Sequence, residues 1–308
     1  MATRSLSALD LPASSPARVA GSTAVSDYWA LTKPEVNFLI LITTFAGFYL
    51  ARATGWQDFP FWLSIHTLLG TLLVASGTGT LNQYLERDFD AQMRRTARRP
   101  LAAGRLKSAS VLWFGLTLSV LGSVYLAVAV NVLASLLAVT TLLSYLLFYT
   151  PLKRKTPLCT LVGAFPGAMP PLIGWAAASG KLNLQAWTLY ALLFLWQFPH
   201  FMAIAWMYRE DYARAGYLVL SPGPYARARL VHLQTVLPVL TLIPVSLFPG
   251  LMGEAKFYLI GALLLGAGLL YYAAQFVVRR SNSAARRLLA ASIIYLPALF
   301  MVMVLARG

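Results

Sequence analysis

Charged residues are scarce in this chain, and acidic residues are the scarcest. Only 11% of its 308 residues are charged and 10 are Asp or Glu, whereas 25 are Lys or Arg and 58% are hydrophobic. Soluble domains carry about 25% charged and roughly 45–50% apolar residues. This composition, with a mean hydropathy of +0.66, excludes a soluble globular enzyme, and the abundance of apolar residues excludes a disordered chain.

Cysteine and histidine are also rare. The single cysteine, Cys159, excludes a disulfide framework and a cysteine-based zinc site, and we expect it simply to pack. Of the three histidines, we expect His66 and His232 to be structural. A net charge of +15 would suit a nucleic-acid partner, but the basic residues lie between long apolar runs. That pattern is typical of a membrane protein, and we expect a lipid bilayer and no nucleic acid as its surroundings.

Long apolar runs dominate the remaining sequence. A helix needs about 20 mostly apolar residues to cross the hydrocarbon layer of a membrane. The chain contains nine such runs, near residues 35–53, 61–84, 109–128, 131–149, 158–178, 185–208, 231–248, 257–278 and 288–305. We therefore predict an all-α polytopic membrane protein with about nine transmembrane helices.

The distribution of basic residues predicts the orientation of these spans. Of the 25 lysines and arginines, 21 fall in the N-terminal segment and in every second loop, and only Arg52, Lys181, Lys256 and Arg307 fall on the other side. Because Lys and Arg are retained on the cytoplasmic side of membranes, we expect a cytoplasmic N-terminus and an external C-terminus.

The chain divides into two predicted parts. Residues 1–27, rich in Ser and Ala, lack the apolar stretch of a signal peptide, and we expect a disordered cytoplasmic tail. Residues 28–308 form the transmembrane domain. The fifth run holds several prolines and glycines, which favour a kinked packing helix over a helix that lines a cavity.

The acidic residues form two tight groups, each at the predicted cytoplasmic end of a span. In the first group, Asn82, Glu86 and Asp90 recur every four residues, so they share one face of a helix, whereas Asp88 points away. A row of oxygen atoms at a membrane-embedded helix end suits Mg²⁺, which proteins hold with one or two carboxylates and substrate phosphates. Carboxylates in apolar surroundings are costly and usually functional.

A structural interpretation competes with this one. Glu86 and Asp90 could be interfacial carboxylates paired with Arg87, Arg94 or Arg95. The run of arginines that follows, Arg94, Arg95, Arg98 and Arg99, could embrace a diphosphate, and it is equally what cytoplasmic loops of membrane proteins contain. Charge alone leaves both interpretations open.

The second group, Glu210 and Asp211, follows the sixth span. If this span continues as a helix, His200, Met207 and Asp211 line one stripe, flanked by Tyr208 and Tyr212, and suggest a cavity wall. The alternative is a helix end at which Asp211 pairs with Arg214.

Several stretches in register resemble the intramembrane prenyltransferases, a family that includes enzymes of ubiquinone and menaquinone synthesis. Residues 82–90 with 93–101 (MRRTARRPL) resemble the first aspartate-rich motif of that family. Within it, the protohaem IX farnesyltransferases are most similar, through residues 31–34 (LTKP), 149–156 (YTPLKRKT), 196–201 (WQFPHF) and 210–216 (EDYARAG). The resemblance spans about residues 28–305.

This resemblance implies a helix bundle around a central cavity, with Mg²⁺ and a prenyl diphosphate at its cytoplasmic mouth. Asn82, Glu86 and Asp90 would hold the metal. Lys153, Arg94 and Arg98 would grip the diphosphate. The remaining candidate contacts are Arg154, Arg214, His200, Tyr208 and Tyr212, with His200 expected at the haem iron or a haem propionate, unless it only packs.

Two departures from the family pattern stand out. The middle acid of the first motif is Glu86, where the wider family has Asp. The second motif is degraded, because its two aspartates would fall at Tyr208 and Tyr212. Only Asp211 and Glu210 remain nearby, and we carry Asp211 as a candidate catalytic and metal-binding residue.

The resemblance further implies an enzyme that joins the farnesyl group of farnesyl diphosphate to a vinyl group of haem b and adds hydroxide. It would reside in a bacterial inner membrane, with a haem A synthase or an oxidase-assembly protein as a partner. Two alternatives remain: a prenyltransferase for a quinone precursor, and a polytopic transporter for an anionic substrate.

Overall fold

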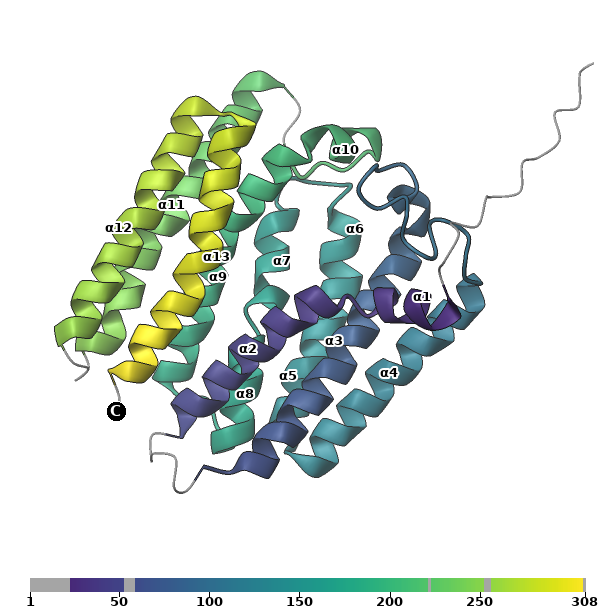
Figure 1. Cartoon of the computed structure of the whole chain (residues 1–308), viewed down its shortest axis with the longest axis horizontal. Helices are drawn as coiled ribbons and strands as arrows, with labels where there is room; N and C mark the ends of the chain where they lie inside the picture. The colour runs from purple at the N-terminus through teal and green to yellow at the C-terminus, as the bar shows by residue number, and fades with distance from the viewer. Residues whose placement is uncertain (1–22, 53–58, 221–222, 252–255, 307–308) are drawn as a thin grey trace, which may run out of the picture.

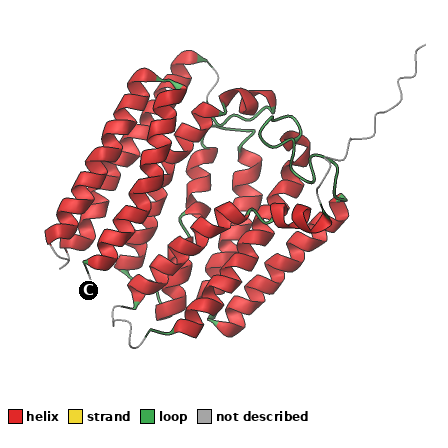
Figure 2. Cartoon of the chain, viewed as in Figure 1, coloured by secondary structure: helices red, strands yellow, loops and turns green. Residues whose placement is uncertain are grey.

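A computed structural model describes residues 23–52, 59–220, 223–251 and 256–306. Within these residues the chain is helical, without strands (Figure 2). Among the described residues, nine helical segments are long and apolar enough to cross a membrane. The prediction of an all-α polytopic protein with about nine spans is therefore confirmed.

The elements follow the predicted spans closely. Their order is α1 (Ala24–Leu31), α2 (Pro34–Ala51), α3 (Phe61–Asp90), α4 (Ser108–Ala129), α5 (Val132–Leu143), a π-helical turn η1 (Ser144–Tyr149), α6 (Thr150–Leu152), α7 (Cys159–Gly167), α8 (Pro170–Ser179), α9 (Leu184–Met207), α10 (Arg209–Arg214), α11 (Pro224–Leu251), α12 (Lys256–Arg279) and α13 (Asn282–Leu305).

Side-chain caps fix several helix starts. Thr23, Asn131, Asn183 and Ser281 each accept a hydrogen bond from the backbone N–H three residues on, at 2.8–3.2 Å, which satisfies a donor that the first helical turn leaves free. The cap at Thr23 places residues 24–27 in α1. A disordered tail thus stays a prediction only for residues 1–22, which lie outside the described residues.

The spans form two groups, one made of α2 to α8 and one made of α11 to α13, and α9 packs against both. α3 packs on α4, while α11, α12 and α13 pack side by side (Figure 1). α9 contacts α7, α8, α11 and α13, so it connects the groups. The largest apolar core lies around α9 and the three last helices.

The fifth predicted span is two short helices. α7 ends at Gly167, and α8 restarts at Pro170, whose missing N–H suits the first turn of a helix. Every residue from Pro170 to Ala178 is buried, and α8 packs closely on α2. The packing interpretation of this span is therefore the one that its burial favours.

α3 is longer than the membrane core requires. Its 30 residues extend over roughly 45 Å at 1.5 Å per residue, against about 30 Å of hydrocarbon. Asn82 begins the last third of the helix. The Asp, Glu and Arg residues of α3 all lie in this last third, so this is the end that extends past the hydrocarbon layer.

Candidate active site

One face of α3 gathers the oxygen-bearing side chains that the sequence singled out. Asn82, Glu86 and Asp90 are 1%, 5% and 1% exposed. Asp88 points outward, and its side chain is 75% exposed. The predicted helical face is confirmed, and it turns toward the protein interior.

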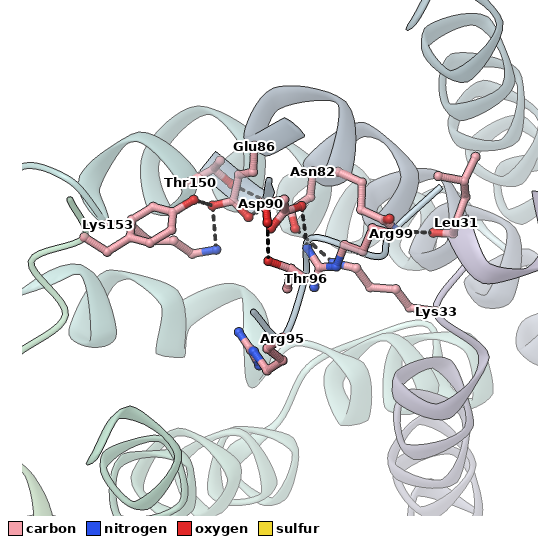
Figure 3. Close-up of polar contacts among 12 residues, drawn as sticks. Leu31, Lys33, Asn82, Glu86, Asp90, Arg95, Thr96, Arg99, Thr150 and Lys153 are labelled. Carbon is pink, nitrogen blue, oxygen red and sulfur yellow. Dashed lines mark hydrogen bonds and ion pairs between the residues drawn. The ribbon is translucent and has the colours of Figure 1, made fainter. Parts of the chain in front are cut away.

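Cations from two other segments reach this face (Figure 3). The Lys153 ammonium, from the loop after α6, donates to Glu86 Oε1 at 2.8 Å. The Lys33 ammonium, from the turn between α1 and α2, donates to Asn82 Oδ1 at 2.9 Å. Lys33 adopts a left-handed backbone conformation, with a φ of 53°, which costs a non-glycine residue about 1–2 kcal/mol.

Neutral groups complete the surroundings of Glu86. The Asn82 amide donates to Glu86 Oε2 at 3.0 Å and to Thr150 Oγ1 at 3.3 Å. The Tyr217 hydroxyl donates to Glu86 Oε1 at 3.1 Å. Thr150 follows directly after the π-helical turn η1, and such turns are frequent at functional sites.

Asp90 is held differently. Arg99 Nη1 donates to Asp90 Oδ2 at 2.7 Å, and the Thr96 hydroxyl donates to the Asp90 backbone carbonyl at 2.9 Å. Asp90 Oδ1 is buried and has no hydrogen-bond partner among the described residues. A buried carboxylate oxygen without a partner is costly, and this one is available to accept a contact from a ligand.

The alternative in which Glu86 and Asp90 pair with Arg87, Arg94 or Arg95 does not match the observed ion pairs. Arg87 pairs with the exposed Asp88 at 3.8 Å and donates to the Tyr84 carbonyl at 2.8 Å. Arg94 is exposed, and Arg95 contacts other residues. The buried acids Glu86 and Asp90 instead pair with Lys153 and Arg99.

The electrostatics of the site follow from burial and from these neighbours. Burial, reinforced by the charges of Arg99 and Lys153, lowers the pKa of Lys33 to about 7. Burial also opposes the charge of Lys153, but its interactions with Tyr149 and Glu86 raise its pKa well above the ordinary value. Burial and the Glu86 carboxylate raise the pKa of Tyr217. Lys153 is thus a firmly protonated cation, whereas Lys33 gains or loses its proton near neutral pH.

The second acidic group does not continue a helical stripe. α9 ends at Met207, and Tyr208, with a φ of −106° and a ψ of 20°, separates it from α10. The predicted stripe of His200, Met207 and Asp211 is therefore wrong, because it assumed an unbroken helix. His200 Nδ1 lies 2.9 Å from Ser292 Oγ on α13, and its ring stacks on Trp196.

Asp211 is buried and both of its carboxylate oxygens are engaged. Arg214 Nη1 donates to Oδ1 at 3.1 Å, and the backbone N–H of Arg95 donates to Oδ2 at 3.3 Å. The Arg95 guanidinium lies over the rings of Tyr208 and Tyr212, at 4.8 and 5.7 Å from their centroids. Asp211 thus ties the arginine-rich loop to α10, and the predicted pairing of Asp211 with Arg214 is present.

The other predicted basic residues, Arg94, Arg98 and Arg154, form no ion pair with an acidic side chain among the described residues. Arg94, Arg98 and Arg154 are exposed, and the Arg154 guanidinium lies 4.1 Å from the centroid of the Phe89 ring. Among the described residues, no three His, Cys, Asp or Glu side chains come together as a metal cluster. A cation bound here would use the Asn82 amide oxygen, the two acids of α3 and oxygens from a ligand.

Sequence reasoning missed three residues that contact this row, Lys33, Thr150 and Tyr217, and it named Arg99 only as one of a run of arginines. Lys33, Arg99 and Thr150 belong to motif stretches already noted, at residues 31–34, 93–101 and 149–156. Tyr217 directly follows the stretch 210–216. The signal was therefore present in the motifs, but the sequence does not show that separate segments converge on α3.

Comparisons with known proteins give a consistent result. Residues 40–303 match the model of the UbiA prenyltransferase family. The protein named protoheme IX farnesyltransferase from Solibacter usitatus (strain Ellin6076) is 48% identical over 91% of this chain and 98% of its own length. The protein of the same name from Koribacter versatilis (strain Ellin345) is 41% identical over 93% of this chain and 94% of its own length.

Two solved structures share the fold. A digeranylgeranylglyceryl phosphate synthase has a TM-score of 0.75 at 16% identity, covering 92% of this chain and 98% of that one. A UbiA homolog from Archaeoglobus fulgidus, bound to GPP and Mg²⁺, has a TM-score of 0.62 at 15% identity, covering 90% of this chain and 99% of that one.

Proposed function

The chain belongs to the UbiA prenyltransferase family, and from this premise we propose that it is a protohaem IX farnesyltransferase. It transfers the farnesyl group of farnesyl diphosphate to a vinyl group of haem b, with addition of hydroxide, and produces haem O. The observation that carries the proposal is the 48% identity to a relative of that name over nearly the full length of both chains. The geometry of the α3 face supports the diphosphate half of the reaction.

The residues at the end of α3 fit a magnesium ion. Asn82, Glu86 and Asp90 supply the hard oxygen donors that Mg²⁺ prefers, and Asp90 Oδ1 is buried without a partner among the described residues. When bound, the ion would neutralise charge on the diphosphate leaving group. Asp211 remains a candidate ligand for a second ion, although Arg214 and Arg95 engage both of its oxygens.

Basic side chains around this face suit the diphosphate. Lys153 stays protonated beside Glu86, while Lys33 and Arg99 lie on the other two oxygen-bearing residues. Lys153 and Arg99 match the two carboxylates in charge, so protonation of Lys33 leaves an excess positive charge in a buried site. Such a charge attracts an anionic group strongly. The exposed Arg94 and Arg98, with Arg154 and Arg214, would extend this surface toward the entering substrate.

For the transfer itself, the protein must exclude water from the reacting groups and supply aromatic rings that stabilise positive charge. The C1–O bond of the farnesyl diphosphate breaks, the vinyl carbon of haem b bonds to C1, and water adds to the other vinyl carbon and releases a proton. The rings of Tyr145 and Tyr149 lie 5.0 Å apart between centroids and are tilted by 59° to each other, and the centroid of the Tyr149 ring lies 4.6 Å from Lys153 Nζ. Their faces would stabilise cationic charge that develops at C1, and the apolar bundle would keep stray water away.

The haem side of the site rests on fewer contacts. His200 is half-buried between α9 and α13 and would contact the haem iron or a propionate. Tyr208 and Tyr212 would border the entrance, where they hold Arg95. We place the enzyme in a bacterial inner membrane, beside a haem A synthase or an oxidase-assembly protein that receives the product.

The decisive experiment supplies purified protein with haem b, farnesyl diphosphate and Mg²⁺. Mass spectrometry should detect a hydroxyethylfarnesyl haem, and a chelator should stop its formation. Unmodified haem together with prenylation of a hydroxybenzoate or naphthoate acceptor would move the assignment to a quinone precursor. Absence of diphosphate release under every condition would refute the enzyme itself.

A further inference from the structure

A cavity of about 310 Å³ lies between the end of α12 and the start of α11, away from the residues of the candidate active site. It is lined by Ala228, Arg229, His232 and Leu233 of α11 and by Arg280, which follows α12. The first turns of α11 and the last turn of α12 lie at the same end of the bundle as α10 (Figure 1). The cavity is therefore at a membrane boundary and not within the hydrocarbon layer.

The cavity is basic without a matching acid. Arg229, His232 and Arg280 are exposed, and none of them forms an ion pair with a carboxylate among the described residues. Arg280 Nε donates to the Val277 carbonyl at 3.2 Å, which anchors the guanidinium at the end of α12. Arg280 also has a positive φ of 45°, a conformation that usually persists only where the surroundings impose it.

An apolar strip continues from the cavity along α11. Arg229, Leu233, Leu237 and Leu240 follow one another at intervals of four, four and three residues, so they share one helical face. The three leucines are 49%, 58% and 48% exposed. A basic residue at the membrane boundary thus stands directly above a row of leucines that faces outward into the hydrocarbon layer.

We propose that this cavity binds the headgroup of an anionic phospholipid. The phosphodiester would lie between Arg229 and Arg280, whose guanidinium groups bind phosphate oxygens well, with His232 beside them. The acyl chains would run along Leu233, Leu237 and Leu240. A soluble phosphate would make no use of the leucines, and basic pockets between transmembrane helices are suited to acidic lipid headgroups. This site goes beyond the proposed function and is independent of it.

The test uses the full-length chain, purified in detergent and examined by native mass spectrometry. Equal amounts of phosphatidylglycerol and phosphatidylcholine with identical acyl chains are added, and the ratio of the two bound lipids is measured. The wild-type protein should retain phosphatidylglycerol preferentially. In the variant Arg229→Gln/Arg280→Gln, the ratio of bound phosphatidylglycerol to bound phosphatidylcholine should fall by about tenfold or more. This is the loss expected when two charge-assisted contacts are removed.

The matched control is Arg286→Gln/Arg287→Gln, which removes the same charge from exposed positions of α13 at the same end of the bundle. It should keep the preference, and an equal loss in both pairs would show diffuse attraction and overturn the proposal. Glycerol phosphate at the same concentration should not displace the lipid, and displacement would assign the cavity to a soluble phosphate instead. If the glutamine pair fails to fold, the single variant Arg229→Gln, at an exposed residue, decides in the same assay.

Discussion

Each of the three oxygen-bearing residues at the end of α3 is engaged by a different basic side chain: Asn82 by Lys33, Glu86 by Lys153 and Asp90 by Arg99. These contacts hold the oxygens in place while leaving Asp90 Oδ1 without a partner among the described residues. Entry of a magnesium diphosphate would therefore exchange these contacts for bonds to the metal and to the phosphate oxygens. This arrangement suits the proposed ligand, which carries both signs of charge.

The first prediction compares three carboxylate residues of α3: Glu86 and Asp90 face the protein interior, whereas Asp88 faces outward. Glu86→Gln and Asp90→Asn should each lower turnover by at least about a hundredfold, since each removes a charged ligand from a water-excluded site. Asp88→Asn, on the exposed side of the same helix, should leave turnover near the wild-type value. Farnesyl transfer to haem b by the folded variants measures this, and equal losses at all three positions would contradict the helical-face argument.

The second prediction concerns Lys33. Its pKa is about 7 in the folded protein, against 10.5 for an ordinary lysine. Unfolding between these two pH values therefore takes up a proton, so the free energy of unfolding should rise as the pH increases through this window. Below pH 7 both states are protonated, and the destabilising effect of the buried charge is fully present.

The measurement is the thermal midpoint of the protein in detergent, with a chelator present, from pH 7 to 9.5. Lys33→Met should flatten the increase, because no proton is then taken up at this position. Lys153, whose pKa is raised, contributes no change in this window. A variant with the same slope as the wild-type protein would assign the pH dependence to other groups.

At the scale of single elements, the contact between α2 and α8 depends on the absence of side chains. A Cβ atom at Gly174 would meet the Thr44 carbonyl oxygen at 1.9 Å, and one at Gly47 would meet the Pro171 carbonyl oxygen at 2.2 Å. Within a membrane the hydrophobic effect does not drive helices together, so close backbone contacts of this kind stabilise their association. They also explain why the span that contains α8 is the most buried of the nine among the described residues.

The third prediction follows from that contact. Gly174→Ala should lower the thermal midpoint clearly, because relieving the clash requires α2 and α8 to separate, at a cost of about 1–3 kcal/mol. Gly268→Ala on α12 is the matched control, since a Cβ atom there meets nothing within 4 Å. Its midpoint should be unchanged or slightly higher, as alanine favours helices. Equal effects in the two variants would contradict the role of the α2–α8 contact.

At the scale of the whole molecule, the two ends of the helix bundle differ in their content of Lys and Arg. The basic residues of the α3–α4 loop, of the loop after α6 and of the segments around α10 lie at one end of the bundle (Figure 1). The candidate active site and the proposed lipid site lie at that same end. The excess of Lys and Arg would hold this end in the cytoplasm, where a soluble diphosphate product could leave.

The fourth prediction is the membrane topology. A reporter that is active only in the cytoplasm, fused after Gly308, should be inactive, while one that is active only outside should work. The same pair of reporters fused within the loop between α3 and α4 should give the opposite result. Cytoplasmic activity at Gly308 would refute either the orientation or the odd number of spans.

The sequence by itself determined the features that depend on local periodicity. Nine apolar runs of sufficient length gave the nine spans, and the interval of four residues put Asn82, Glu86 and Asp90 on one face of α3, because helix geometry relates neighbours along the chain in a fixed way. The motif stretches gave the family. The prolines and glycines of the fifth run also predicted a kink, and the structure has a break there, between α7 and α8.

Only the tertiary structure decided which segments meet. Lys33 and Thr150 lie 49 and 68 residues from Asn82 along the chain, and Tyr217 lies 131 residues from Glu86; no periodicity relates them. The break at Tyr208 also separated Asp211 from His200, which an unbroken helix would have kept on one stripe. These contacts depend on how long-range packing brings the spans together and on where backbone geometry interrupts a helix, and neither is encoded in the spacing of residues within a single span.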